Sequence, residues 1–194
     1  MTTPSLVEGL RSDQSMYWSR LARLYGPILD YWLQQAGVAV AERADVQQEI
    51  LSAVARNIDK YHHTPGCTGS LRRWMWGIAR HKVADYFRDR QRRPVSEGGT
   101  EALMKLQQLP ELPFEDSDPD TQTRIRKELC SRALAILQSD FAETTWRAFW
   151  LTVIEDRSAD EVAEQLGMTK HAIRQARYRV LRRLREELGD DLPE

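Results

Sequence analysis

One stretch near the C-terminal end carries a dense set of groups that could bind a polyanion. Residues 169–188, TKHAIRQARYRVLRRLREEL, contain seven Lys or Arg residues and two Glu residues, a net charge of +5. At about 100° per residue, a helix over this stretch places its large aliphatic residues on one stripe for burial. The opposite arc carries hydrogen-bond donors and acceptors. Such side chains recognise a partner, and we expect no bond-making chemistry from them.

A helix that enters the DNA major groove reads base edges with residues near its N-terminus. Arg174 suits guanine and Gln175 suits adenine, while Arg179 and Arg183 lie to one side, where contact with phosphate is the simpler role. The alternative is a solvated helix face balanced by Glu186 and Glu187. The predicted DNA-contacting residues of this helix are Thr169, Lys170, His171, Arg174, Gln175, Tyr178, Arg179 and Arg182.

The residues just before this helix are the ones that must position it. Ser158 and Glu161 have the spacing of a capping box, in which the hydroxyl and the carboxylate satisfy free backbone amides at a helix start. Gly167 supplies the permissive backbone that a helix end needs, and Thr169 can cap the next helix. The sequence therefore predicts two helices, 158–166 and 169–188, that meet at a tight turn as in a helix-turn-helix.

A second basic segment, residues 70–93, mixes cations with aromatic rings. Residues 72–93 contain eight Lys or Arg and two Asp residues, a net charge of +6. Helical spacing gives one apolar stripe at Leu71, Met75 and Ile78, with Arg73, Trp76, Arg80 and Phe87 on nearly the opposite arc. Cations and exposed rings together suit single-stranded or melting DNA. The alternative is that the rings are core; we assign Trp74 and Tyr86 to the core and leave Trp76 and Phe87 open.

The whole chain of 194 residues reads as all-α, because period-two alternation is missing and few segments are rich in β-branched residues. In the first half, helices are expected from about Asp13 or Ser15 to Leu33, with a kink or break at Gly26-Pro27, then over 45–61 and 70–93. Residues 94–120 contain seven acidic residues and one basic residue, Lys105. We predict a flexible linker at 95–120, with one short helix at 101–109. The second half should have helices at 121–138, 143–155, 158–166 and 169–188. Its expected apolar residues are Leu129, Leu134, Leu137, Trp146, Phe149, Trp150, Val153, Val162 and Leu166.

Several classes of function are disfavoured by the sequence. No apolar run approaches the roughly 18 residues of a membrane span, and the N-terminus lacks the pattern of a secretory signal. With two cysteines in separate segments, a reducing cytoplasm is the expected compartment. His62, His63, Cys67 and His81 lack the paired spacing of zinc ligands, so we predict no metal site. Phosphate-binding and nucleophile motifs are missing as well, which predicts no cofactor and no enzyme activity.

Three motifs in order resemble those of bacterial RNA polymerase sigma factors of the extracytoplasmic-function (ECF) type. DVQQEI at 45–50 is similar to the acidic motif with which such factors grip the clamp helices of the polymerase's largest subunit. GSLRRWMWGIARHKVADYFRDRQRR at 69–93 is similar to the segment that recognises and opens the minus-ten promoter element. FAETTWRAFWLTVIEDRSADEVAEQLGMTKHAIRQARYRVLRRLREEL at 141–188 resembles the domain that reads the minus-thirty-five element and touches the polymerase flap.

The resemblance implies three parts: a region 2-like domain at 1–94, a linker at 95–120 that passes along the RNA exit path, and a region 4-like helix-turn-helix domain at 121–194. It implies polymerase contacts at Asp45, Gln48, Glu49 and Ile50, and minus-ten contacts at His62, His63, Arg73, Trp76, Arg80 and Phe87. The loop 62–69 would capture a flipped base. Its sequence HHTPGC is unusual, and His81 stands where many relatives have Asn, so its base preference is left open.

The expected partners are core RNA polymerase and promoter DNA, with an anti-sigma protein as an optional inhibitor. No membrane insertion is expected, and the free chain should be a monomer. Two other classes stay open at this stage. A stand-alone helix-turn-helix regulator would use only the last domain, and a protein-binding adaptor would not depend on Arg174 or Arg182.

Overall fold

A computed structural model of the chain describes residues 5–12, 15–62, 70–92 and 119–192. Within these ranges the chain is helical and forms no strand, which confirms the all-α prediction. The α-helices are α1 (Leu6–Arg11), α2 (Ser15–Gln35), α3 (Arg43–Asn57), α4 (Ser70–Arg92), α6 (Pro119–Leu137), α7 (Glu143–Phe149), α8 (Ala159–Leu166) and α9 (Lys170–Leu188). The predicted linker helix at 101–109 and most of the predicted base-capturing loop lie outside the described residues.

The described residues divide into two compact units, one of residues 7–125 and one of residues 126–194 together with 1–6. The boundary falls inside α6, the helix in which the predicted boundary at Thr121 also lies. We call the two the N-terminal unit and the C-terminal unit.

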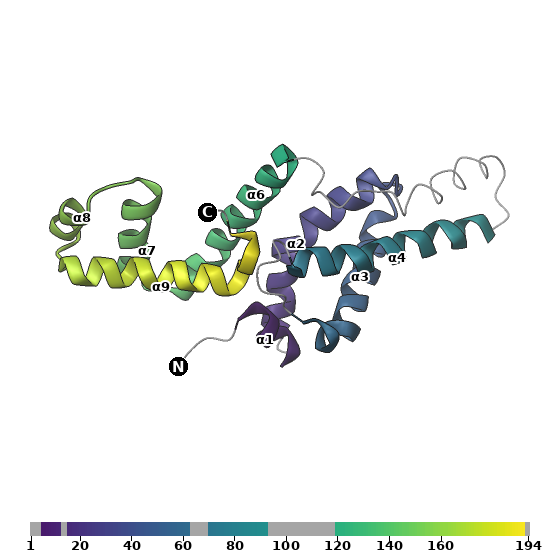
Figure 1. Cartoon of the computed structure of the whole chain (residues 1–194), viewed down its shortest axis with the longest axis horizontal. Helices are drawn as coiled ribbons and strands as arrows, with labels where there is room; N and C mark the ends of the chain where they lie inside the picture. The colour runs from purple at the N-terminus through teal and green to yellow at the C-terminus, as the bar shows by residue number, and fades with distance from the viewer. Residues whose placement is uncertain (1–4, 13–14, 63–69, 93–118, 193–194) are drawn as a thin grey trace. The chain divides into compact units, whose positions relative to one another are not determined.

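In the N-terminal unit, α3 packs against both α2 and α4 (Figure 1). Helix α2 runs without a break through Gly26-Pro27, where the sequence predicted a kink or an end. Helix α1 was not predicted, since six residues are too few to give a clear periodicity. It packs closely on α2, because a Cβ added to Gly9 would lie 2.2 Å from the Tyr17 ring.

Helix α4 buries a wider arc than its sequence predicted. Beyond the expected Leu71 and Met75, the buried residues include Trp76, Ala79, Val83 and Phe87. The rings of Trp76 and Trp32 meet edge to face with centroids 5.0 Å apart, so α2 covers one flank of α4 while α3 covers another. The arc assigned to DNA stacking is therefore partly core, because two helices rather than one pack against α4.

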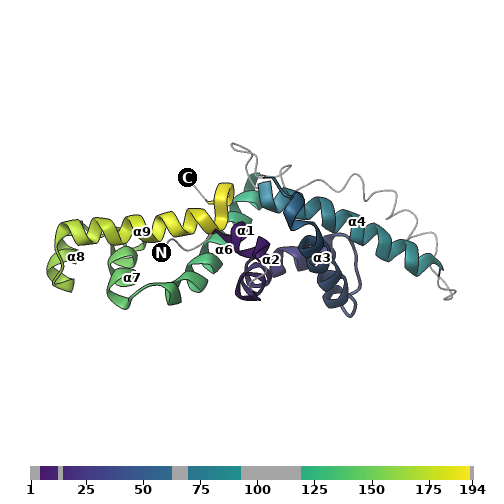
Figure 2. The same ribbon diagram turned by 90° about the horizontal axis from the view of Figure 1, so that it is seen from below.

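The C-terminal unit is built around α9, which packs along α7 and α8 (Figures 1 and 2). After α7 the chain widens into a π-helical turn at Trp150–Ile154, in which the Glu155 amide donates to the Trp150 carbonyl at 3.1 Å. Of the expected apolar residues, Leu129, Leu137, Trp146, Phe149 and Val162 are buried. Trp150 belongs to the same set but is 38% exposed, with its ring centroid 6.2 Å from that of Trp146.

Candidate functional site

The turn between α8 and α9 is fixed by local hydrogen bonds. Ser158 Oγ accepts from the Glu161 amide and the Glu161 carboxylate accepts from the Ser158 amide, both at 3.3 Å, which is the predicted capping box. Gly167 has φ +62°, in the left-handed region that glycine tolerates. The Thr169 hydroxyl caps α9 by accepting from the Ala172 amide at 3.1 Å.

A small apolar core sets the orientation of α9 relative to α8. Ile173 and Ala176 of α9 pack with Val162 and Ala163 of α8, and residues of α7 and the π-helical turn complete the cluster. Val180, Leu184 and Leu188 continue the buried stripe toward the end of α9. Burying this stripe determines which residues of α9 meet solvent.

The residues of α9 predicted to contact DNA lie on its exposed side. Tyr178 is 57% exposed, and the guanidinium of Arg182 lies 6.0 Å from its ring centroid. Lys170 also pairs with Asp160 of α8 at 2.5 Å. Eight predicted residues are exposed: Thr169, Lys170, His171, Arg174, Gln175, Tyr178, Arg179 and Arg182.

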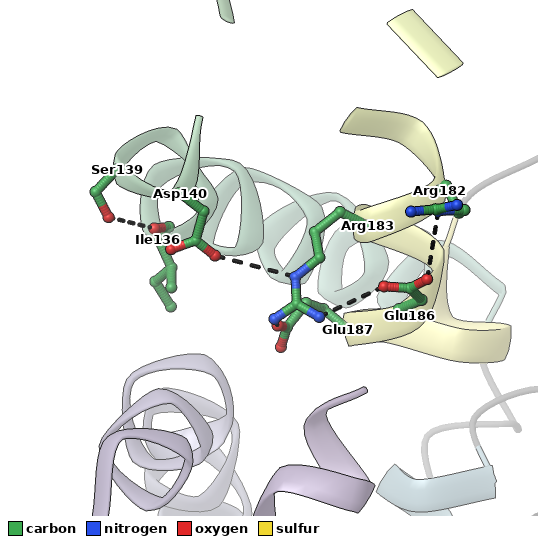
Figure 3. Close-up of polar contacts among 7 residues, drawn as sticks. All are labelled: Ile136, Ser139, Asp140, Arg182, Arg183, Glu186 and Glu187. Carbon is green, nitrogen blue, oxygen red and sulfur yellow. Dashed lines mark hydrogen bonds and ion pairs between the residues drawn. The ribbon is translucent and has the colours of Figure 1, made fainter. Parts of the chain in front are cut away.

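Arg183 differs from this pattern, and the predicted phosphate role for it is wrong. Its side chain is 6% exposed and donates from Nη2 to Glu187 Oε1 at 2.5 Å (Figure 3). It also lies 3.5 Å from Glu186 and 4.0 Å from Asp140, which ends the 3-10 turn Gln138–Asp140 after α6. The basic residue count of α9 therefore includes one buried cation, whose ion-pair partners include Glu186 and Glu187 of the same helix and Asp140.

On α3, the predicted acidic motif lines an open depression of about 420 Å³. Its walls are Asp45, Gln48, Glu49, Ser52, Arg56 and Lys82. Glu49 is ion-paired with Lys82 of α4 at 3.3 Å, so α4 contributes to this surface. Ser52 and Arg56 were not predicted, although their helical spacing from Asp45 places them on the same stripe.

Ile50 does not belong to this surface. It is 0% exposed and packs in the core of the N-terminal unit, so its prediction as a polymerase contact is wrong in this structure. A residue one position after Glu49 points about 100° around the helix, which is enough to turn it inward.

The predicted minus-ten residues separate into an exposed group and a buried group. His62 and Arg73 are exposed and Arg80 is half-buried, whereas Trp76 and Phe87 are 8% and 5% exposed. Stacking of DNA bases on Trp76 or Phe87 is therefore excluded in this structure, since their faces are already packed. Predicted core residue Trp74 is half-buried against Tyr61, with ring centroids 5.3 Å apart. His63 lies outside the described residues.

A polar cluster at the end of α4 was not predicted. The Tyr86 hydroxyl donates to Glu42, and Arg90 Nη1 lies 2.7 Å from both the Glu42 carboxylate and the Tyr86 oxygen. Burial, followed by the hydrogen bond to Glu42, raises the pKa of Tyr86. The cluster ties the basic end of α4 to the residue that precedes α3.

The described residues show no grouping of three His, Cys, Asp or Glu side chains of the kind that a metal ion requires. His81 instead uses Nδ1 to donate to the Gly77 carbonyl at 2.6 Å. Cys67, one of the four residues weighed above as zinc ligands, lies outside the described residues.

Among the helices that the structure describes, none has the length and hydropathy of a membrane span.

Comparison with known proteins gives a consistent group of relatives, although no family model matches the chain. The ECF RNA polymerase sigma factor SigD of Mycobacterium tuberculosis is 29% identical over 159 residues, which cover 79% of this chain and 69% of the relative. The ECF RNA polymerase sigma factor ShbA of Streptomyces griseus is 29% identical over 141 residues, or 73% of this chain and 69% of the relative. The chain is similar to ECF RNA polymerase sigma factors. This similarity agrees with the resemblance drawn from the three motifs.

Proposed function

We propose that this protein is an ECF-type sigma factor that binds core RNA polymerase and directs it to specific promoters. The observation that carries the proposal is the division of α9 into two sides. Its aliphatic stripe is buried against α7 and α8, while the eight residues predicted to contact DNA are exposed. The similarity to relatives named as ECF sigma factors supports the same function.

Duplex DNA is the ligand that suits the exposed side of α9. Arg174 and Gln175 lie in the second turn of the helix, where a recognition helix places its base-reading residues. Arg179 and Arg182 follow farther along, suited to phosphates. In this proposal α9 reads the minus-thirty-five element, with α8 and its capping box holding it at a fixed angle.

Polymerase is the proposed partner of the depression on α3. Asp45, Gln48 and Glu49 line it, and exposed carboxylates there suit a basic helical surface such as the polymerase clamp. Ile50 supports these residues from behind as a core residue.

The minus-ten role of α4 is proposed in a revised form. Arg73, Arg80 and His62 supply the cations and hydrogen bonds for the separated strand, whereas Trp76 and Phe87 keep α4 rigid from inside. Promoter opening then depends on the exposed residues of α4 and of the loop that precedes it.

The proposal is tested by selecting promoters from genomic fragments. Bacterial core RNA polymerase is mixed with the full chain, and the retained fragments are sequenced. We expect a shared upstream motif with the wild type and its loss with Arg174→Ala/Gln175→Ala, while polymerase binding is unchanged. Arg185→Ala is the matched control, because it removes an exposed arginine of α9 that lies outside the predicted set.

Two results would contradict the proposal. One is an identical set of fragments with the wild type and the Arg174→Ala/Gln175→Ala variant. The other is tight, sequence-specific binding of duplex DNA by the chain alone with no retention by polymerase, which would favour a stand-alone regulator.

A further inference from the structure

The exposed Arg182 and the buried Arg183 share one carboxylate. Glu186 Oε1 lies 3.5 Å from Arg182 Nε, and Glu186 Oε2 lies 3.5 Å from Arg183 Nη1 (Figure 3). The exposed fractions of the three side chains are 52% for Arg182, 26% for Glu186 and 6% for Arg183. Glu186 therefore connects a predicted DNA contact to a core ion pair.

The second arginine restricts what Glu186 can do. On an ordinary helix surface, a glutamate next to a DNA-binding arginine can rotate away when a phosphate arrives. Here a rotation that releases Arg182 also moves the carboxylate away from Arg183, whose guanidinium is buried. Because Glu186 is held from the core side, it stays within reach of Arg182.

A phosphate that approaches Arg182 must then compete with an anion already in place. Arg182 lies eight residues after Arg174, roughly 12 Å along the helix, where contacts go to the backbone of the duplex rather than to base edges. Arg182 thus adds one positive charge to α9, but it binds phosphate less strongly than an unpaired arginine would, because Glu186 already pairs with it.

We infer that Glu186 is a positioning residue that holds Arg182 back from DNA phosphate and lowers the affinity of α9 for duplex DNA. This inference rests on the proposed function, since it takes α9 as the helix that binds the duplex. Its consequence is that the chain binds DNA of arbitrary sequence more weakly than the charge of α9 would allow. Contacts near Arg174, which carry sequence information, then make up a larger share of the total binding.

The test measures binding of the full chain to a fluorescein-labelled duplex of mixed sequence over a series of NaCl concentrations. Glu186→Gln should bind about two- to fivefold more tightly, the range that an exposed ion pair supplies. The slope of log K against log salt should steepen by about 0.9, as expected for one additional phosphate contact. Glu164→Gln is the matched control, because it removes the same charge from the exposed side of α8.

A double-mutant cycle decides whether the effect passes through Arg182. In an Arg182→Ala background, Glu186→Gln should give no gain. A gain that persists there, an equal gain with Glu164→Gln, or no gain from Glu186→Gln in the wild-type background would each overturn the inference.

A second comparison does not depend on the folding of the Glu186 variant. Arg179 has no carboxylate within ion-pair distance among the residues that the structure describes. Arg179→Ala should therefore weaken binding more than Arg182→Ala does, and equal losses would count against the inference. If neither Arg174→Ala nor Arg179→Ala weakens binding, α9 is not the DNA-binding helix and the proposed function itself fails.

Discussion

Removing the Glu187 carboxylate should destabilise the C-terminal unit far more than removing its neighbour Glu186. Glu187 is 1% exposed at its side chain and accepts from a guanidinium that is 6% exposed, so the two charges of this pair are both out of water. Deleting one member of such a pair typically costs about 3–5 kcal/mol, because the other charge is left buried. The stability cost of Glu187→Gln should lie near the lower end of this range, at about 3 kcal/mol. Glutamine still offers an oxygen to Arg183, and Arg183 keeps Glu186 at 3.5 Å.

Hydrogen exchange of the α9 backbone amides measures the loss of stability in this helix separately from the other helices. A loss of about 3 kcal/mol speeds exchange on the order of 100-fold, because 1.4 kcal/mol is a factor of ten. Peptides from α3 serve as an internal reference. Glu186→Gln should cost less than about 1 kcal/mol, since Glu186 is only half-buried, its partner Arg182 is exposed, and the Arg183–Glu187 pair stays in place. Equal effects of the two substitutions would refute this account of Arg183, as would a cost below about 1 kcal/mol for Glu187→Gln.

Three further predictions concern other parts of the chain. Ser158→Ala should cost about 1 kcal/mol in the exchange protection of α8, because it leaves the Glu161 amide without its cap; unchanged protection would show that the capping box is not needed. Trp76→Ala should cost about 3–5 kcal/mol in urea unfolding of the N-terminal unit, and a stable variant that had lost only promoter opening would restore the stacking interpretation. Tyr86 should ionise above its ordinary pKa of 10.0, so its stabilising effect is complete below that pH and is lost as the pH rises through the raised pKa. Tyrosinate absorbance should show this late phase in the wild type, and its persistence in Tyr86→Phe would assign it to another tyrosine.

The parts of the fold that sequence could predict are those decided within a few residues. The capping box at Ser158, the left-handed Gly167 and the Thr169 cap depend on neighbours in the chain, and all three are present. The exposed side of α9 was predictable for the same reason, because its aliphatic stripe has a regular spacing.

The parts that sequence could not predict depend on what packs against each helix. The sequence left Trp76 open between core and DNA contact, and in the structure Trp32 of α2 packs against it. Arg183 was grouped with Arg179 as a phosphate contact, yet it turns toward Asp140, 43 positions earlier in the chain, and is buried. The charge pattern gave the right total for α9 but could not assign each cation to DNA or to the core.

We propose above all that the acidic residues lining the α3 depression bind RNA polymerase. Capture of core polymerase on the immobilised full chain tests this most directly. The wild type should retain core polymerase, and Asp45→Lys/Glu49→Lys should lose it, because both reversals place cations where the exposed carboxylates lie. Asp59→Lys is the control, since it reverses an exposed carboxylate just after α3 that does not line the depression. Retention by the wild type and the control, but not by the reversed variant, is the result that we predict. No retention of polymerase by the wild type, under conditions in which an established sigma factor binds, would contradict the account.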